Sequence, residues 1–217
     1  MWFIVRIANF VEAKYFRMSS FNPIIQDKKI DSKIVVSLER ISEAFRVLLW
    51  DESKKNSLSP IQVKILIFLL FHSKAQCKVS YLAKEFNMTK ATISDSIKAL
   101  HRKGLIIKEN DANDTRSYII SLSDEGMVIA RQSSVFAKPF EKTLEEMNIS
   151  KKEIILDGLL NLIANLNKAE VITIQRMCTT CSNYLSGSSS HYCKLLELEL
   201  KTNELRIDCN EHTSYKI

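Results

Sequence analysis

The sequence predicts a mainly α-helical protein with two short β-hairpins. Apolar residues recur at helical spacing through most of the 217 residues, and the chain contains only 4 Gly and 3 Pro. So few turn-forming residues exclude an all-β fold with many tight turns, and also a nucleotide site built on repeated glycines. The 46% of hydrophobic and 26% of charged residues are ordinary for soluble globular domains with a sizeable core.

Residues 1–32 are expected to form an N-terminal extension. Residues 1–11 are apolar enough to suggest a signal peptide, but Arg6 interrupts them and no small-x-small cleavage site follows. Met18 is an alternative start of translation, because the chain from Ser19 onward is an ordinary polar N-terminus. No run of about 18 apolar residues is present, so we expect no membrane span and a cytoplasmic protein with reduced thiols.

Helical periodicity defines the first two helices. From Ile34 to Leu48, apolar side chains recur at steps of four, three, four and three, which is the spacing of an amphipathic helix. The second helix begins at Ser59-Pro60-Ile61-Gln62, which combines an N-cap serine, a proline at the first helical position and a glutamine at the capping-box position. It continues through apolar residues 63–71 and is expected to be buried nearly all round.

Two further helices follow in close succession. Ser80 is expected to cap a short helix, and Asn87 to end it in a left-handed conformation. Thr89 is expected to cap the next helix, residues 90–103, which Gly104 stops.

A β-hairpin comes next. Residues 105–109 and 117–122 have extended patterns, and the Asn- and Asp-rich segment 110–114 between them suits a polar turn. A short helix, a tight turn, a second helix with a polar outer face and a two-stranded hairpin form the pattern of a winged helix-turn-helix.

Two helices are predicted beyond the hairpin. Ser123 opens the first of them, and Pro139 should kink this helix if it continues to Met147. A capping box at Ser150 and Glu153 begins the last helix. Its apolar stripe consists of Ile155, Leu159, Leu162 and Leu166.

The helix at 90–103 is the candidate recognition helix. Its inner face carries Ile93, Ile97 and Leu100, which are expected to be core residues. Its outer face is small near the start, which suits base edges, and basic further on, which suits phosphates. The candidate DNA-binding residues are Lys90, Ala91, Thr92, Ser94, Asp95, Lys98 and Arg102 of this helix, with Asp114 and Arg116 of the wing.

Two of these candidates are acidic. Asp95 is expected to form a surface ion pair with Lys98 or Arg102, and the alternative is a hydrogen bond from a cytosine amino group. Asp114 is expected to position Arg116, since an arginine suits a narrow, electronegative minor groove.

The charge of the chain is concentrated in the candidate DNA-binding segment. The net charge is +6 overall, +4 between residues 74 and 121, and −1 between residues 178 and 217. The basic surplus therefore lies where DNA would bind.

Six short motifs in the right order resemble the MarR family of bacterial transcription regulators over residues 33–170. These motifs are Leu58-Ser59-Pro60-x-Gln62, Val79-Ser80-x-Leu82-Ala83, Thr89-x-x-Thr92-Ile93-Ser94, Leu100-x-x-Lys103-Gly104-Leu105-Ile106, Asp114-x-Arg116 and Leu122-Ser123-x-x-Gly126. The resemblance implies a homodimer whose terminal helices interlace, recognition helices in successive major grooves and wings in minor grooves. It also implies a cleft between the DNA-binding and dimer regions where a small-molecule effector can bind.

Residues 171–217 form a cysteine-rich tail in which we expect a metal-stapled β-hairpin. Residues 196–201 and 205–208 alternate with period two, so they predict a hairpin that places Cys193 and Cys209 at its open end. The expected metal ligands are Cys178, Cys181, Cys193 and Cys209, with His191 and His212 as possible substitutes.

The ligand set favours zinc. Cys-x2-Cys places two thiolates on one tight turn, which is the spacing that binds a tetrahedral ion, and a closed four-thiolate site suits a redox-inert metal. An iron–sulfur cluster is the alternative, because the single third and fourth cysteines are similar in order to the cluster-binding segment of high-potential iron–sulfur proteins. The fifth cysteine, Cys77, is expected to be an ordinary semi-buried thiol, and His72 and His101 are expected to be surface or cap residues.

The sequence therefore predicts a homodimeric, cytoplasmic, sequence-specific regulator of transcription, most simply a repressor, that binds a double-stranded DNA operator. It is not expected to be an enzyme, because no base, nucleophile or phosphate loop is recognisable. The tail follows the last dimer helix, so its metal or redox state is expected to act through dimer geometry, or else the metal only stabilises the dimer. The alternative function is a metal- or redox-sensing protein whose winged helix contacts other proteins.

Overall fold

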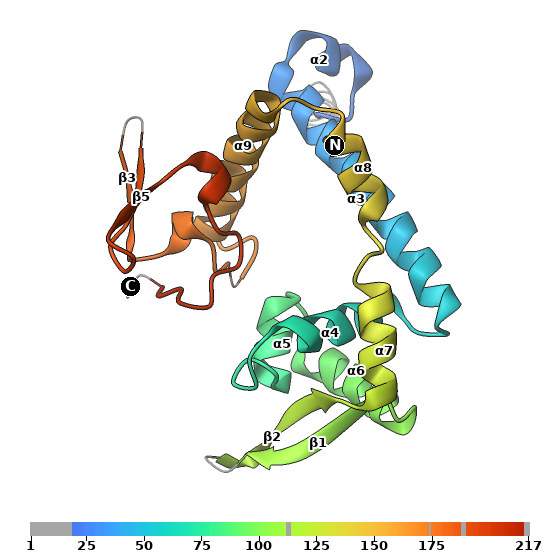
Figure 1. The fold of residues 1–217 in the computed structure, drawn as a ribbon. Helices are drawn as coiled ribbons and strands as arrows, with labels where there is room; N and C mark the ends of the chain where they lie inside the picture. The colour runs from blue at the N-terminus through green and yellow to red at the C-terminus, as the bar shows by residue number, and fades with distance from the viewer. Residues whose placement is uncertain (1–18, 112–113, 174, 188–189, 215–217) are drawn as a thin grey trace, which may run out of the picture. The chain divides into compact units, whose positions relative to one another are not determined.

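The computed structural model describes residues 19–111, 114–173, 175–187 and 190–214 (Figure 1). The chain divides into two compact units, one up to Pro60 and one from Ile61 onward, and each is described by itself. No helix within the described residues is both long and apolar enough to cross a membrane.

The described part of the first unit, from Ser19, contains two helices, α2 (Pro23–Lys28) and α3 (Ile30–Lys55). The side chain of Asn22 caps α2 by accepting a hydrogen bond of 3.0 Å from the backbone N–H of Ile24. Both helices begin within the segment expected as an extension, and α3 extends the predicted apolar stripe by about three turns in total. Much of that stripe is exposed in the single chain.

The second unit begins with a helix-turn-helix. It consists of α4 (Pro60–Phe71), α5 (Val79–Glu85) and α6 (Lys90–Arg102). The predicted signals at the turn are confirmed, because Asn87 has a φ of 54° and the Thr89 side chain accepts a hydrogen bond from Thr92 N–H at 3.1 Å. Gly104, with a φ of 72°, follows the end of α6 as expected.

The predicted cap at Ser80 is wrong, because α5 begins one residue before it. The backbone carbonyl of Cys77 accepts a hydrogen bond of 2.9 Å from Ile120 of the hairpin, and Lys78 occupies the N-cap position without a side-chain bond. This tertiary bond determines where the helix begins.

The wing is an antiparallel hairpin of β1 (Ile106–Asp111) and β2 (Asp114–Leu122), as the sequence predicts, with strands longer than expected. Helix α7 (Asp124–Ser133) follows, and Ser123 caps it. Gly126 is required here, because a Cβ atom at this position would overlap the carbonyl oxygen of Leu105. The same carbonyl accepts the Ser123 N–H at 3.2 Å, so the wing and α7 meet backbone to backbone.

The core of the winged helix joins these elements. Its fully buried side chains include Val63, Ile65, Leu66, Leu82, Ile93, Ile97, Leu100 and Ile120. The inner face predicted for α6 is therefore confirmed.

Two predictions for the later helices are wrong in detail. Helix α7 ends at Ser133 instead of kinking at Pro139, which lies in the first turn of a separate helix, α8 (Lys138–Glu145), where its missing N–H costs nothing. The last helix, α9 (Ile149–Lys168), is capped by Asn148, whose side chain accepts a 2.9 Å bond from Lys151 N–H. Asn148 is a strong N-cap and displaces the predicted capping box at Ser150.

The tail folds differently from the predicted hairpin. It forms a three-stranded antiparallel sheet of β3 (Tyr184–Ser186), β4 (His191–Cys193) and β5 (Leu198–Leu200). Residues 205–208 are not a strand, because Leu205 packs with Leu160 of α9 and Met177 instead. The Glu204 carboxylate also accepts a 2.7 Å bond from Lys201 N–H and closes a short helical turn, η2 (Thr202–Glu204).

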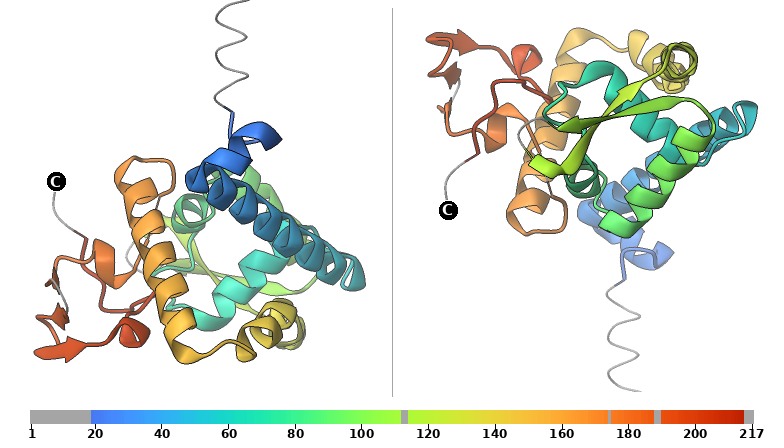
Figure 2. Two further views of the ribbon diagram at one scale, coloured as in Figure 1. Left: turned by 90° about the horizontal axis from the view of Figure 1, so that it is seen from above. Right: turned by 90° about the horizontal axis from the view of Figure 1, so that it is seen from below.

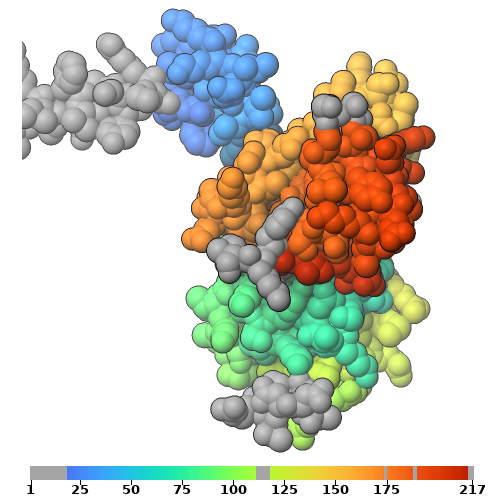
Figure 3. Space-filling view, turned by 90° about the vertical axis from the view of Figure 1, so that its left-hand side faces the viewer, coloured from blue at the N-terminus to red at the C-terminus, as the bar shows by residue number. Residues whose placement is uncertain are grey.

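The tail packs beside α9 in both views of Figure 2. The tail also contacts the α4–α5 segment of the winged helix, as the space-filling view shows (Figure 3). The second unit thus brings the cysteine-rich tail to the helix-turn-helix.

Candidate nucleic-acid interface and cysteine-lined cavity

The outer face of α6 is polar and accessible. Lys90, Ala91, Thr92, Asp95, Lys98 and Arg102 are exposed, and Ser94 is half-buried. The opposite face is fixed in the core, so the helix presents this surface in one orientation. The predicted recognition residues of α6 are therefore brought together on one face.

Asp95 pairs with Lys98. Their side-chain atoms are 3.1 Å apart, and the two side chains are 76% and 63% exposed. The expected surface ion pair is confirmed, and Arg102 has no part in it.

The wing candidates are placed only in part. The backbones of Asp114 and Arg116 belong to β2, and their side chains lie outside the described residues. Lys108 of β1, which the sequence did not single out, has its ammonium 4.9 Å from the centre of the Tyr118 ring. This cation–π contact holds a positive charge on the wing.

The tail contains a cavity of about 260 Å³ that four cysteines line. They are Cys178, Cys181, Cys193 and Cys209, which are all the predicted thiol ligands. All four are free thiols. The structure therefore collects side chains that are up to 31 positions apart in the sequence around one space.

Arg206 is the charged group of this cavity that contacts the sulfur atoms. Its backbone N–H donates to Cys178 Sγ at 3.2 Å, and its guanidinium donates to Cys209 Sγ at 3.7 Å. Burial raises the pKa of Cys178, the Arg206 N–H opposes that rise, and the three neighbouring thiols add to it.

The two predicted substitute ligands point elsewhere. His191 Nδ1 lies 2.6 Å from the Tyr184 hydroxyl, and His212 Nε2 lies 3.1 Å from the hydroxyl and the carbonyl oxygens of Thr180. Neither lines the cysteine cavity. Within the described part of the chain, no group of three or more His, Cys, Asp or Glu side chains is already positioned to hold a metal ion.

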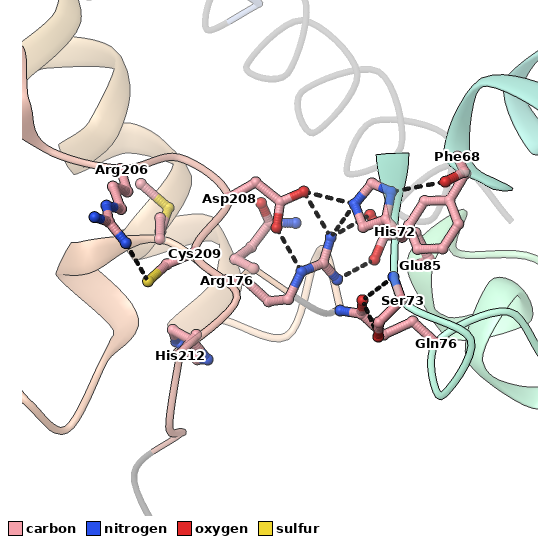
Figure 4. Close-up of polar contacts among 12 residues, drawn as sticks. Phe68, His72, Ser73, Gln76, Glu85, Arg176, Arg206, Asp208, Cys209 and His212 are labelled. Carbon is pink, nitrogen blue, oxygen red and sulfur yellow. Dashed lines mark hydrogen bonds and ion pairs between the residues drawn. The ribbon is translucent and has the colours of Figure 1, made fainter. Parts of the chain in front are cut away.

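A partly buried ion cluster connects the tail to the segment of α4 and α5. At its centre is Arg176, whose guanidinium bonds Asp208 at 2.6 Å and 3.0 Å and Glu85 at 2.6 Å (Figure 4). Tyr81 accepts a further bond at 2.7 Å, and His72 Nε2 lies 2.7 Å from Asp208. We call these five residues the Arg176 cluster.

The cluster is electrostatically strong. Burial lowers the pKa of Arg176, but its bonds to Asp208 and Glu85 outweigh that effect and raise the pKa above the ordinary value. The same bond to Arg176 lowers the pKa of Asp208, against its burial and with help from His72. Arg176 and Asp208 are therefore kept charged at neutral pH, and the Arg176 side chain is only 10% exposed.

Sequence reasoning missed this cluster. His72 directly follows α4, and its Nδ1 lies 2.8 Å from the Phe68 carbonyl oxygen, so the expectation of a surface or cap residue holds for the cap. The sequence did not indicate that its ring stacks on Phe68 at 3.6 Å between centres or that its side chain is only 14% exposed. Within the cluster, Arg176 and Asp208 are 32 positions apart, and the bonds from the tail to His72 and Glu85 join residues 91 to 136 positions apart, so no local spacing signals them. Cys77 is a buried thiol as expected, and burial raises its pKa to about 11.

The fold and the exposed helix face define a winged helix-turn-helix. The MarR family model matches residues 56–117, which span α4 to the wing. Members of that family are non-enzymatic DNA-binding regulators, in agreement with the expectation that this chain is not an enzyme. The match supports a MarR-type winged helix in this chain.

A curated relative and two solved structures agree with this assignment. The chain is 28% identical over 109 residues to the uncharacterised HTH-type transcriptional regulator YdgJ of Bacillus subtilis, covering 48% of this chain and 64% of YdgJ. It therefore spans less than two thirds of that relative's length.

Among solved structures, a MarR protein from Peptoclostridium difficile has a TM-score of 0.57 at 19% identity, covering 65% of this chain and 92% of its own. The S. aureus MepR–DNA complex has a TM-score of 0.53 at 22% identity, covering 60% and 96%. At such identities these similarities show the fold.

Proposed function

We propose that the chain is a homodimeric transcription regulator, most simply a repressor, that binds a double-stranded DNA operator through α6 and the wing. The observation that supports this function best is the outer face of α6, whose accessible residues are small at one end and basic at the other. This face has the shape and charge that a major groove accepts, with Lys98 and Arg102 placed for phosphates.

The dimer is proposed from two apolar surfaces. On α3, Ile34, Ile41, Phe45 and Trp50 are 40% to 49% exposed. On α9, Ile155, Leu159, Leu162 and Leu166 are 38% to 43% exposed. Exposed apolar rows of this length on two long helices call for a partner surface, and a second copy of the chain supplies the same rows. A dimer also allows two recognition helices to reach grooves about 34 to 36 Å apart.

The DNA-binding proposal is tested by salt dependence. Binding to phosphates releases counterions, so the logarithm of the association constant should fall linearly with the logarithm of salt concentration. Lys98→Ala and Arg102→Ala should each reduce that slope by about one. Lys151→Ala, an exposed lysine at the start of α9, is the matched control and should leave the slope unchanged.

The wing contributes a separate test. Arg116→Ala is expected to weaken operator binding by about 1 to 3 kcal/mol without altering the fold. A gel-shift titration with unchanged affinity would show that the wing arginine does not contact DNA.

The dimer proposal is tested on two adjacent residues of α9. Leu159, 38% exposed, should lie in the dimer interface, whereas Leu160, 2% exposed, packs on the tail of its own chain. Leu159→Asp should give monomers or insoluble protein, because a carboxylate buried in an apolar interface is costly. Light scattering that finds a normal Leu159→Asp dimer contradicts this interface.

The second candidate function is a metal- or redox-sensing protein whose winged helix contacts other proteins. The cysteine cavity favours sensing of this kind. An association with DNA that does not change with salt would favour this function over DNA recognition.

A further inference from the structure

The fold of the tail gathers four thiols by backbone hydrogen bonds. Cys181 N–H donates to Cys178 O at 3.0 Å and closes the turn between the first two cysteines. Cys178 N–H donates to Arg206 O at 2.9 Å, and Cys209 N–H donates to Arg176 O at 2.8 Å. These bonds tie the segment around Cys209 to the segment around Cys178. Cys193 reaches the same cavity from β4.

The surroundings of the cavity suit thiolates. The Arg206 N–H and guanidinium both donate to sulfur atoms, and they supply a positive charge beside them. Hydrogen bonds of this kind to sulfur orient and stabilise thiolate ligands of a metal. Four leucines also line the cavity, namely Leu195, Leu196, Leu198 and Leu200.

The tail also lacks a core large enough to hold it together. Among its described residues, only Met177, Cys181 and Leu205 are buried. In the turn between Cys178 and Cys181, the hydroxyl of Thr179 is buried and has no hydrogen-bond partner among the described residues. A fold with so little apolar burial requires a further source of stability, which a structural metal provides.

We propose that Cys178, Cys181, Cys193 and Cys209 bind one zinc ion as four thiolates, and that zinc holds the Arg176 cluster in place against α4 and α5. Four thiolates around a closed site are a common structural zinc centre. The hydrogen bonds of His191 and His212 hold both rings elsewhere, so among the predicted ligands only the four cysteines line the cavity. The sulfur atoms of this structure are not yet at coordinating positions, so zinc draws them together as it displaces their protons.

The zinc site is joined to the Arg176 cluster through the backbone. Arg176 lies two residues before Cys178, and Asp208 directly precedes Cys209. Both residues bond each other and reach α4 and α5 through His72 and Glu85 (Figure 4). Bound zinc therefore fixes Arg176 and Asp208. These two residues hold α5, the helix that precedes the recognition helix α6.

The sequence predicted that the tail acts through dimer geometry. The connection from the zinc site through the Arg176 cluster is different, because it leads directly to the helix-turn-helix. Loss of zinc should free the tail from α5 and change how α6 is supported. The consequence for operator affinity rests on the proposed function, whereas the zinc site and its effect on α5 do not.

The zinc site is tested on the full-length protein. Purified protein should contain one zinc per chain and should be colourless. Replacement by cobalt(II) should give strong thiolate-to-metal charge-transfer absorption and the visible bands of tetrahedral coordination. Cys178→Ser, Cys193→Ser and Cys209→Ser should each reduce the charge-transfer band and weaken cobalt binding at least tenfold.

The chain offers matched controls. Cys77→Ser removes the one cysteine outside the cavity, and His191→Ala and His212→Ala remove the alternative ligands, so all three should retain the full cobalt spectrum. A loss of the spectrum in either histidine variant overturns the four-thiolate site. Brown protein with iron and acid-labile sulfide, or protein that binds neither zinc nor cobalt, overturns the zinc proposal.

The link to α5 is tested by hydrogen exchange with and without a chelator. Removing zinc from the native protein should speed amide exchange in α5 at least tenfold, with little change in α7. Arg176→Met should keep one zinc per chain but lose this response, because it removes the bond to Glu85 that joins the tail to α5. If removing zinc from the native protein leaves the rate of amide exchange in α5 unchanged, the link to α5 is overturned, even if the cobalt spectrum confirms the metal site.

Operator binding completes the experiment. In the native protein, zinc removal should change operator affinity, and in Arg176→Met it should not. If no DNA binds under any condition, the proposed function fails while the spectra and exchange rates still decide the zinc site and its link. If DNA binds equally well with and without zinc despite altered exchange in α5, the regulatory consequence is overturned.

Discussion

The winged helix and the cysteine tail of the same unit are stabilised in different ways. The winged helix buries an apolar core contributed by every one of its helices from α4 to α6 and by the wing. The tail buries three side chains and otherwise relies on backbone hydrogen bonds, free thiols and the Arg176 cluster. The comparison teaches that the first region folds by burying apolar surface, whereas the second depends on specific polar chemistry.

The difference bears on function. A region held by apolar burial keeps its shape when solution conditions change, which suits a surface that reads DNA. A region held by thiols and ion pairs responds to metal ions, so it is suited to regulation. The Arg176 cluster joins the two regions, so a change in the metal state of the tail can reach the winged helix through it.

The largest expected effect tests the apolar core directly. Leu66 is fully buried in α4, so Leu66→Ala should lower the free energy of unfolding by about 2 to 5 kcal/mol. Leu205→Ala, in the tail, should leave the unfolding midpoint of the winged helix unchanged and speed amide exchange only in the tail. Urea denaturation with hydrogen exchange measures both, and equal losses in both variants would mean that the regions unfold together.

A smaller effect is expected where the wing meets α7. Gly126→Ala forces a Cβ atom against the backbone carbonyl of Leu105, which cannot move away as a flexible side chain could. The substitution should therefore lower the free energy of unfolding by about 1 to 3 kcal/mol. Gly158 of α9 has nothing within 4 Å of such a Cβ atom, and Gly158→Ala should stabilise by about 0.5 to 1 kcal/mol. The midpoint temperatures of thermal unfolding of the two variants should shift in opposite directions from that of the native protein. Equal shifts contradict the close approach at Gly126.

The winged helix could be predicted because its signals are local. The N-caps at Thr89 and Ser123 and the left-handed Asn87 each depend on residues a few positions apart, and all three are confirmed. The errors there arose where a distant or stronger partner intervened. The Cys77–Ile120 bond moved the start of α5, and Asn148 outcompeted Ser150 as a cap.

The tail could be predicted only in its chemistry. Four cysteines in a short segment indicated a shared site, and they line one cavity. Period-two alternation wrongly indicated a strand at residues 205–208, because the burial of Leu205 against α9 depends on a contact 45 positions away in the sequence. Nothing near Arg176 in the sequence signals that it bonds Glu85, so the Arg176 cluster was beyond reach of pattern reasoning.

The third prediction concerns the connection between the two regions. Arg176→Met keeps much of the side-chain volume but leaves the Glu85 and Asp208 carboxylates without their main partner. The tail should lose about 1 to 3 kcal/mol of its protection against amide exchange, with the core of the winged helix unaffected. Arg131→Met on the exposed surface of α7 is the control and should change neither region. Unchanged exchange in the tail of Arg176→Met would mean that apolar packing on α9 alone holds it.

The smallest effect is expected at Asp95, on the DNA-reading surface of the rigid region. Its ion pair with Lys98 is highly exposed, so Asp95→Asn should change the free energy of unfolding by less than about 0.5 kcal/mol. Operator affinity should rise, because the substitution removes a negative charge facing phosphates and frees Lys98 to contact them. The gain should stay below about tenfold, since exposed charges interact by about 1 kcal/mol or less in water. Competition titrations with operators altered one base pair at a time measure both affinity and base preference. If Asp95 instead accepts a hydrogen bond from a cytosine amino group, affinity will fall, and the preference for a C·G pair at one position will disappear.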